Sequence, residues 1–257
     1  MRARVRRVRR RLVRATRVGI IVAFFSFVEV AARAGWIDQL ALVPVTVMVQ
    51  QLIEYFQNGQ IYPHLASTGA SFLSTIMLAI VTGIPFGIAL WRIPVLERML
   101  NPYLTSYYAI PVFVFYPLLI VFFGITVWPL ILISWAYAVV AVVVNTSYGF
   151  REVPLILRKV ARIHRLGWWP RFWKVEFPAA SPYVFNGLKL AVAYGLVAVI
   201  ASEFILSTRG LGWVIAYNYN SFQVSKMYAG ILLVLVISIF VYVLLSLVQR
   251  RLGHVRR

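Results

Sequence analysis

The sequence predicts an all-α integral membrane protein with six transmembrane helices, and its composition and the placement of its charges support this. Of the 257 residues, 61% are hydrophobic and only 13% are charged. A soluble domain carries about 25% charged residues, because these cover its water-facing surface. The chain has too few for such a surface, so the hydrocarbon core of a bilayer is its expected solvent.

Six apolar stretches are long enough to cross a membrane, which takes about 20 residues in helical form. In order they are Val18–Ala34, Ala66–Trp91, Tyr107–Phe123, Trp128–Tyr148, Val184–Leu206 and Met227–Val248. The segment between the first two stretches is too polar to span. Within it, Val45–Phe56 has the apolar spacing of an amphipathic helix, and we expect this helix to lie on the outer membrane surface.

Lys and Arg collect in the cytoplasmic loops of membrane proteins, and this rule orients the six spans. With both termini in the cytoplasm, 22 of the 26 Lys and Arg residues lie on the inner side. They comprise nine in the N-terminal tail, two after the second span, seven after the fourth and four in the C-terminal tail. Reversing the chain or removing one span destroys this distribution. The predicted topology is therefore six spans with both termini cytoplasmic.

The N-terminal segment has the features of a secretory signal peptide: a basic run, an apolar stretch, and Ala32–Ala34 as a cleavage site. We expect it to be retained, because the topology needs it as the first span. Residues 1–17 then form a basic cytoplasmic tail drawn to anionic lipid, and residues 18–257 form one transmembrane domain. Glu29 and Arg33 stand four residues apart and are predicted to pair on one helix face.

The longest cytoplasmic loop after the N-terminal tail, about residues 149–183, lies between the fourth and fifth spans. Pro154 can begin a helix with an apolar stripe, Gly167 is expected to end it, and Pro170 is expected to begin a second short helix. Pro178 and Pro182 come before the fifth span. The sequence thus predicts a rigid elbow with an exposed apolar face. Either a protein partner or lipid headgroups must cover that face.

This loop resembles the coupling loop of type I ABC-importer permeases. The pattern of that family is Glu-Ala-Ala, three residues, Gly, nine residues, then a hydrophobic residue, any residue, Leu and Pro. Aligned on Phe177–Pro182, the first positions fall on Lys159, Val160 and Ala161, and the glycine position falls on Arg165. The end of the motif is therefore similar, whereas its beginning departs from the pattern.

The resemblance extends along about 220 residues and narrows to the nitrate, sulfonate, taurine and bicarbonate group of these permeases. The similar stretches are Phe27–Arg33, Leu42–Pro44, Gly83–Gly87, Ala109–Pro111, Phe123–Ile125, Asn145–Thr146, Ala201–Phe204 and Gly210–Gly212. Their order and spacing carry the resemblance. In the second span, Gly83 and Gly87 have the spacing of close helix packing.

The resemblance implies a permease subunit of an ATP-driven importer in the bacterial inner membrane, moving a small anion by alternating access. Implied partners are cytoplasmic ATPase subunits that bind ATP and Mg²⁺, a second permease copy or paralogue, and an external solute-binding protein. The residues implied in ATPase coupling are Pro154, Leu155, Leu157, Lys159, Val160, Ala161, Ile163, Arg165, Leu166 and Gly167. A heterocyclic vitamin precursor as substrate, and a degenerate half of a permease heterodimer, are the alternatives within this class.

Candidate pathway or gating residues are polar or aromatic side chains within the spans, together with Pro111. They are Tyr107, Tyr108, Pro111, Phe113, Tyr116, Asn145 and Glu203. The third span is predicted to be a helix broken at Pro111, and irregular backbone inside a membrane is tolerated where it lines a cavity. Acids inside spans are costly and mark functional sites, although Glu203 also suits a structural hydrogen bond to another helix or to the loop 210–212. Asn145 needs a partner on a neighbouring helix.

Two other classes of protein fit the sequence less well. An integral-membrane enzyme needs a cluster of acids, His or metal ligands, and the chain offers only seven acids, three His and no Cys. A nucleic-acid binder carries its positive charge on a polar surface, whereas here the basic residues stand between apolar blocks. A non-transporting membrane scaffold remains open, because the coupling motif is degenerate. We therefore expect no catalytic residues, metal or cofactor in this chain.

Overall fold

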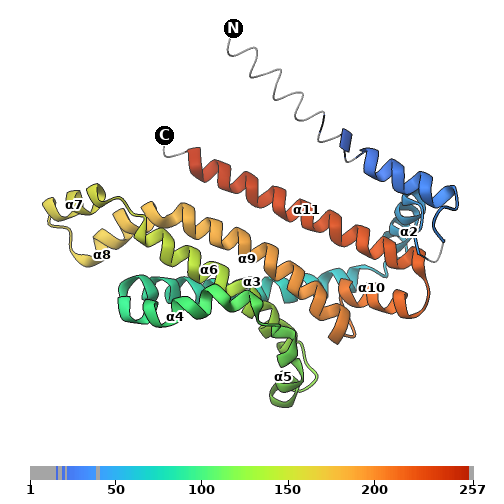
Figure 1. Cartoon of the computed structure of the whole chain (residues 1–257), viewed down its shortest axis with the longest axis horizontal. Helices are drawn as coiled ribbons and strands as arrows, with labels where there is room; N and C mark the ends of the chain where they lie inside the picture. Colours follow the sequence, from blue (N-terminus) through green and yellow to red (C-terminus); the bar gives the residue numbers. More distant parts are fainter. Residues whose placement is uncertain (1–15, 17–18, 21, 39–40, 255–257) are drawn as a thin grey trace, which may run out of the picture. The chain divides into compact units, whose positions relative to one another are not determined.

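The computed structural model describes residues 16, 19–20, 22–38 and 41–254, and throughout this part the regular structure is helical, without a β-strand. Residues 22–33 are helical. After them come α2 (Val45–Gln57), α3 (Tyr62–Arg92), α4 (Pro94–Ser106), η1 (Tyr107–Ala109), η2 (Val112–Phe115), α5 (Tyr116–Phe123), α6 (Trp128–Arg151), α7 (Leu155–Ile163), α8 (Trp168–Arg171), η3 (Phe172–Glu176), α9 (Phe177–Leu206), α10 (Leu211–Asn220) and α11 (Val224–His254) (Figure 1). The predicted basic tail, apart from residue 16, and part of the first predicted span lie outside the described residues.

Four helices in the described part are long and apolar enough to cross a membrane: Tyr62–Arg92, Trp128–Arg151, Trp168–Leu206 and Val224–Gln249. They contain the second, fourth, fifth and sixth predicted spans. A fifth candidate is a bent pair of helices, Pro94–Ala109 and Val112–Phe123. The prediction of a helical membrane protein is confirmed, with four or five candidate spans in the part described.

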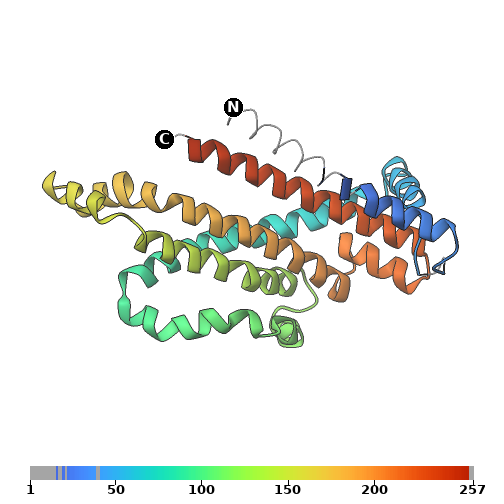
Figure 2. The same cartoon turned by 45° about the horizontal axis from the view of Figure 1, so that its top comes forward.

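The chain divides into two compact units. The first comprises Met1–Ile61 and Val214–Leu233, and the second comprises Tyr62–Trp213 and Val234–Arg257. The centre of the second unit is a three-helix core in which α3, α6 and α9 lie side by side (Figures 1 and 2).

Glycines let the helices of this core approach closely. A Cβ atom built on Gly87 of α3 would lie 2.7 Å from Thr146 Cβ and 2.7 Å from the Val143 carbonyl oxygen, both on α6. At Gly83, one turn earlier, it would lie 2.9 Å from Val142 Cβ. The predicted helix-packing role of Gly83 and Gly87 is therefore confirmed.

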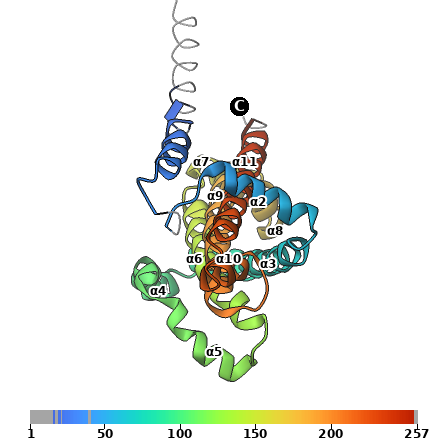
Figure 3. The same ribbon diagram turned by 90° about the vertical axis from the view of Figure 1, so that its right-hand side faces the viewer.

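The third predicted span is broken at Pro111, as the sequence predicts for this proline. The segment Tyr107–Phe123 breaks at Ile110 and Pro111, and the helices on either side meet at 92° (Figure 3). Proline has no N–H to donate and favours extended backbone in the residue before it. Ile110 takes that conformation, with φ −82° and ψ 123°. Two short 3-10 helices replace the α-helix around the break.

The fifth predicted span begins earlier than expected. The α8, η3 and α9 segments form one continuous helix from Trp168 to Leu206, with a π-helical turn at Phe172–Glu176. Pro182 lies inside this helix and leaves the Pro178 carbonyl without its usual backbone donor. The Ser181 hydroxyl donates to that carbonyl at 3.0 Å, so the helix continues past the proline.

The first helix of the predicted elbow ends at a different residue from the one expected. Helix α7 stops at Ile163, and Arg165 adopts a left-handed backbone with φ +48°. The N–H of Leu166 then donates to the Ala161 carbonyl, and that of Arg165 to the Arg162 carbonyl. This is a Schellman motif, in which glycine usually holds the left-handed position. The prediction that Gly167 ends the helix is wrong, because Gly167 has φ −59° and begins α8 with Trp168, ahead of Pro170.

We expect Arg165→Gly to stabilise the end of α7 by up to about 1 kcal/mol, because glycine adopts left-handed backbone without steric cost. The gain is limited, since glycine also raises the entropy of the unfolded chain. Slower hydrogen exchange of the Leu166 amide is the measurement. Gly167→Ala is the matched control and should be neutral, because an added Cβ comes no closer than 3.9 Å to Pro170. The reverse result would show that Gly167 is the true helix stop.

In the first unit, a polar cluster joins the helix of residues 22–33 to the start of α2. Arg33 Nε donates to Glu29 Oε1 at 2.6 Å, which confirms the predicted pair. The Thr46 N–H donates to Glu29 Oε2 at 3.1 Å, so Glu29 also caps α2. The sequence predicted α2 correctly. It missed α4 and α10, which lie in segments treated as loops.

Candidate functional site

The segment between α6 and α9, residues 152–176 and called the elbow below, presents the exposed apolar face that the sequence predicts. Leu155 and Ile163 of α7 are 68% and 78% exposed. Ala161 faces the opposite way and is buried. Arg158, Lys159 and Arg162 lie on the same short helix, which has no acid in its first turn. The elbow is therefore an apolar surface set in positive charge.

The elbow is held rigidly to the core of the second unit. Phe172 stacks on Phe150 of α6 with ring centroids 5.5 Å apart and planes 7° from parallel. Arg158 Nη2 donates to the Phe150 carbonyl at 2.6 Å. Within the elbow, Arg171 forms an ion pair at 2.7 Å with Glu176, an almost fully buried carboxylate at the residue before α9. A charge at that depth needs such a partner, so the elbow moves with the helix ends that carry it.

The residues predicted to couple to a partner are mostly accessible. Ala161 is buried and Leu166 half-buried, whereas Pro154, Leu155, Leu157, Lys159, Val160, Ile163, Arg165 and Gly167 are exposed. The three departures from the family pattern, Lys159, Val160 and Arg165, therefore lie at the surface. Three tryptophans that the prediction did not emphasise, Trp168, Trp169 and Trp173, extend the exposed face beyond α7.

The aromatic pathway candidates gather around the break at Pro111. The Tyr108 ring lies 5.2 Å from Tyr194 of α9, and Phe113 lies 5.5 Å from Tyr137 of α6. Tyr107 packs edge-on against Tyr108 at 5.9 Å. Tyr116 lies apart from this group, and its hydroxyl donates to the Leu206 carbonyl at 3.1 Å. Tyr137 and Tyr194 were missed, because a single aromatic residue in an apolar span carries no signal of its own.

Asn145 finds its partner on another helix, as its depth requires. The side-chain amide of Asn186 on α9 donates to Asn145 Oδ1 at 3.1 Å. Asn145 Nδ2 in turn donates to the Ala141 carbonyl one turn back on α6 at 2.9 Å. The pair joins α6 to α9, separately from the aromatic group.

Glu203 is the most enclosed of the predicted residues, with 1% of its surface exposed. The Thr68 hydroxyl of α3 lies 2.9 and 2.8 Å from its two carboxylate oxygens, and the Gly212 N–H donates to Oε2 at 3.1 Å. Thr68 also accepts the N–H of Leu211 at 2.8 Å. These four residues, called the Glu203 network below, join α3, the end of α9 and the start of α10. The structural alternative that the sequence left open, a bond to a helix and to the loop 210–212, describes this geometry.

Glycine is required where the chain turns beside this carboxylate. Gly210 has φ +108°, and a Cβ atom there would overlap the Glu203 carboxylate. Its N–H donates to His64 Nδ1 at 3.2 Å, and the His64 ring stacks on Trp213 at 5.1 Å. His64 and Thr68 could not be predicted from the sequence, because they stand more than 130 residues before their partners.

Comparison with known proteins identifies the class to which this fold belongs. The family model described as "Binding-protein-dependent transport system inner membrane component" matches residues 79–254. The chain therefore belongs to this family of multi-pass inner-membrane transport permeases of ABC type, which are not enzymes. The resemblance found in the sequence is confirmed.

Curated relatives differ in the solute that their names give. The chain is 25% identical over 240 residues to the taurine transport system permease protein TauC of Escherichia coli, covering 91% of this chain and 87% of that protein. It is 28% identical to the nitrate import permease protein NrtB of Synechocystis, over 74% and 72% of the two chains. It is 29% identical to the riboflavin transport system permease protein RibX of Chloroflexus aurantiacus, over 61% and 59%.

A solved structure has the same fold. Inward-facing conformations of the MetNI methionine ABC transporter match with a TM-score of 0.63 and 17% identity, over 75% of this chain and 98% of that chain.

Proposed function

We propose that this chain is the membrane-spanning subunit of a type I ABC importer, with six spans and both termini in the cytoplasm. The four long apolar helices, the bent pair counted as one span, and a first span that includes the helical residues 22–33 give six. The positive-inside distribution supports the orientation. Residues 1–17 are then a cytoplasmic tail and residues 18–257 the permease domain, within which the elbow faces the cytoplasm.

The elbow carries the proposed coupling to ATP hydrolysis. An ATPase subunit docks on the exposed apolar face of α7, and its acidic groups meet Lys159 and Arg162. ATP and Mg²⁺ are bound by that partner, and this chain contributes no catalytic group. Closure of two ATPases brings two elbows together. Because each elbow is fixed to α6 by Phe172 and Arg158 and continues directly into α9, the spans move with it as rigid bodies.

The backbone at Arg165 helps to decide whether this elbow still couples to an ATPase or belongs to a degenerate permease half. The family pattern has glycine at this position, and the arginine here keeps the left-handed backbone that glycine favours. The shape of the helix end is therefore preserved despite the substitution. This favours a working elbow over a non-transporting scaffold. The permease partner is a second copy or a paralogue of this chain.

The proposed substrate is a small anion such as taurine or another sulfonate, nitrate or bicarbonate, delivered by an external solute-binding protein. Relatives named for taurine and nitrate support this class. The riboflavin relative favours a second candidate, a heterocyclic vitamin or its precursor, which suits the aromatic group around Pro111. Tyr108, Phe113 and Asn145 are proposed to line or gate the pathway, whereas the Glu203 network joins α3 to the end of α9 and the start of α10.

Deleting Leu155–Gly167 tests the proposed function. The detergent-solubilised wild-type chain should co-purify with its ATPase, and the deletion should abolish that binding while the spans still insert. Protease accessibility of both termini in inside-out vesicles checks insertion. An ATPase that stays bound to the deletion variant would show that the elbow is not the coupling site. A wild-type chain that never binds an ATPase would contradict the importer function.

A further inference from the structure

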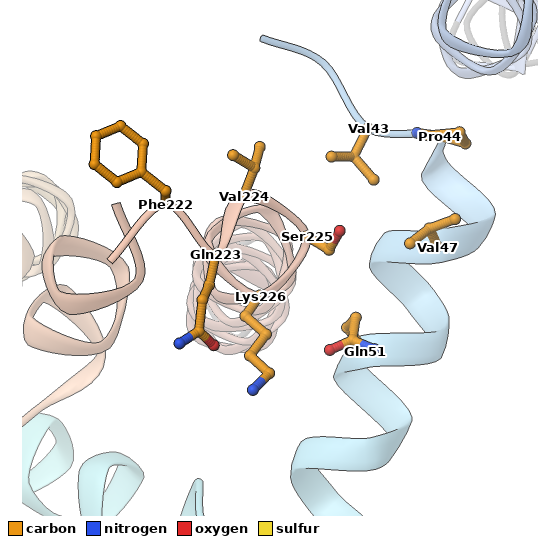
Figure 4. A pocket seen from close by; sticks show the side chains of 9 residues that line it. All are labelled: Val43, Pro44, Val47, Gln51, Phe222, Gln223, Val224, Ser225 and Lys226. Atoms are coloured by element: carbon orange, nitrogen blue, oxygen red, sulfur yellow. The ribbon is translucent and has the colours of Figure 1, made fainter. Parts of the chain in front are cut away.

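A hollow in the first unit has the size and lining of a small-molecule site, and no role has been assigned to it above. It has a volume of about 600 Å³ and lies between α2 and the turn that leads into α11 (Figure 4). Sites for small ligands in proteins enclose roughly 300–1,000 Å³ and combine apolar walls with a few polar groups. The hollow is therefore large enough for a short organic molecule.

One side of the hollow is polar and positive. Figure 4 shows the side chains of Gln51, Gln223 and Lys226 extending to the same side of the space, and Ser225 also lines it. Among the described residues, Lys226 forms no ion pair. Gln51 donates one N–H to Glu54 at 3.0 Å, and Glu54 itself does not line the hollow. The polar side thus offers an ammonium group and amide donors, with a single net charge.

Apolar side chains complete the lining, with Val43 and Val47 on the α2 side and Val224 at the start of α11. Phe222 stands at the rim, 82% exposed. It has φ +55° and holds the left-handed position of a second Schellman motif, with Gln223 N–H donating to the Asn218 carbonyl. A bulky residue in that backbone conformation is unfavourable, and such strain concentrates at functional sites. The strain points to a use for the Phe222 ring.

The two walls are fixed relative to each other before any ligand binds. Asn218 of α10 donates through Nδ2 to the Tyr55 hydroxyl of α2 at 3.0 Å, and both residues are buried. The Tyr228 hydroxyl of α11 donates to the Ala41 carbonyl at 2.6 Å. Because the walls are already ordered, ligand binding does not carry the entropic cost of ordering them.

We propose that this hollow binds a short-chain organic monoanion, such as an alkyl sulfonate or carboxylate. The anionic head accepts hydrogen bonds from Lys226 and from the amides of Gln51 and Gln223. The alkyl stem packs on Val43 and Val47, and Phe222 stands at the open rim. One ammonium group matches one negative charge, which favours a sulfonate or carboxylate over a phosphate dianion. The choice of ligand class rests on the proposed function, but binding is measured on this chain alone, without an ATPase, so failure of this proposal is distinguishable from failure of the proposed transport.

A single introduced thiol tests the proposal, because the chain has no cysteine. Ser225→Cys places a thiol in the lining, and N-ethylmaleimide reports its accessibility in nanodiscs of phosphatidylcholine. Ethanesulfonate at about ten times its Kd should slow alkylation about tenfold by mass action. The neutral isostere ethyl methyl sulfone should not slow it. Ser221→Cys, in the same turn but outside the hollow, is the matched control and should be unaffected.

Two further variants separate the head from the stem of the ligand. In the Ser225→Cys variant, adding Lys226→Gln should raise about tenfold the ethanesulfonate concentration that halves the alkylation rate. The reason is that a charge-assisted contact to the anionic head is lost. Adding Phe222→Gly should weaken protection while leaving the chain at least as resistant to thermal unfolding, since glycine relieves the backbone strain. The wild-type chain should also show a higher unfolding temperature with ethanesulfonate.

Three results would overturn the proposal. The first is that ethanesulfonate does not slow alkylation of the Ser225→Cys thiol. The second is that the neutral sulfone slows it equally. The third is that Lys226→Gln leaves the effect of ethanesulfonate unchanged. Nanodiscs that contain phosphatidylglycerol identify a different occupant. Protection there without added ethanesulfonate, together with none by ethanesulfonate in phosphatidylcholine, would assign the hollow to a lipid headgroup instead of a free solute.

Discussion

Glu203→Ala should lower the free energy of unfolding by about 3–5 kcal/mol, the largest effect of any single substitution proposed for this chain. The change leaves the Thr68 hydroxyl and the Gly212 N–H without their partner, and each unsatisfied buried group costs about 1–3 kcal/mol. It also leaves a cavity between α3, α9 and α10. Thermal unfolding of the purified chain in detergent is the measurement, followed by the intrinsic fluorescence of its eight tryptophans.

The conservative variant should lose much less stability. In Glu203→Gln the amide oxygen still accepts the Gly212 N–H, and the amide nitrogen can donate to Thr68, so we expect a loss of about 1–2 kcal/mol. Glu54→Gln removes an acid from an exposed position and should change stability by no more than about 0.5 kcal/mol. If Glu203→Ala behaves like Glu54→Gln, the network does not stabilise the fold, and a role in gating becomes the better explanation.

Gly87→Ala should destabilise the three-helix core by about 1–3 kcal/mol. The added methyl group would meet the Thr146 side chain close to the α6 backbone and the Val143 carbonyl, neither of which can move without displacing α6. Denaturation in a series of mixed micelles with increasing SDS measures the loss. The expected cause is overpacking, so the variant should fold with α3 and α6 farther apart.

Gly69→Ala provides a control on the same helix. A Cβ atom at Gly69 meets nothing within 4 Å, so only the intrinsic helix preference changes. Alanine is favoured over glycine in helices by up to about 1 kcal/mol, and Gly69→Ala should be neutral or stabilising. The two substitutions are chemically identical and should differ in sign. If both substitutions destabilise the chain, the close contact between α3 and α6 does not explain the effect of Gly87→Ala.

Hydropathy placed most of the helices, because the length of an apolar stretch is a direct physical requirement for crossing a bilayer. The break at Pro111 was predicted, but hydropathy alone does not distinguish this proline from those that stay inside a helix. Pro85 and Pro182 lie inside α3 and α9, whereas the chain turns at Pro111. The difference depends on whether other groups satisfy the freed carbonyl, as Ser181 does for Pro178. Such compensation comes from the folded structure and is weakly encoded in local sequence.

The candidate site also combines residues that could be predicted from local sequence with residues that only the folded structure reveals. Glu203 could be singled out because an acid is costly in a membrane span, yet Thr68 and His64 became visible only when the fold brought α3 beside α9. The exposed face of α7 followed from the spacing of apolar residues alone. The end of that helix did not, because a glycine two residues beyond Arg165 gave a more obvious but incorrect stop signal.

The continuous helix from Trp168 to Leu206 connects the elbow to the Glu203 network. At 1.5 Å per residue its 39 residues extend about 58 Å, nearly twice the thickness of a hydrocarbon core. A rotation of about 10° around its midpoint would move each end by about 5 Å in opposite directions. The elbow is attached to one end and the Glu203 network to the other. Because the Ser181 hydroxyl keeps the helix continuous past Pro182, a small displacement at either end is transmitted to the other as tilt.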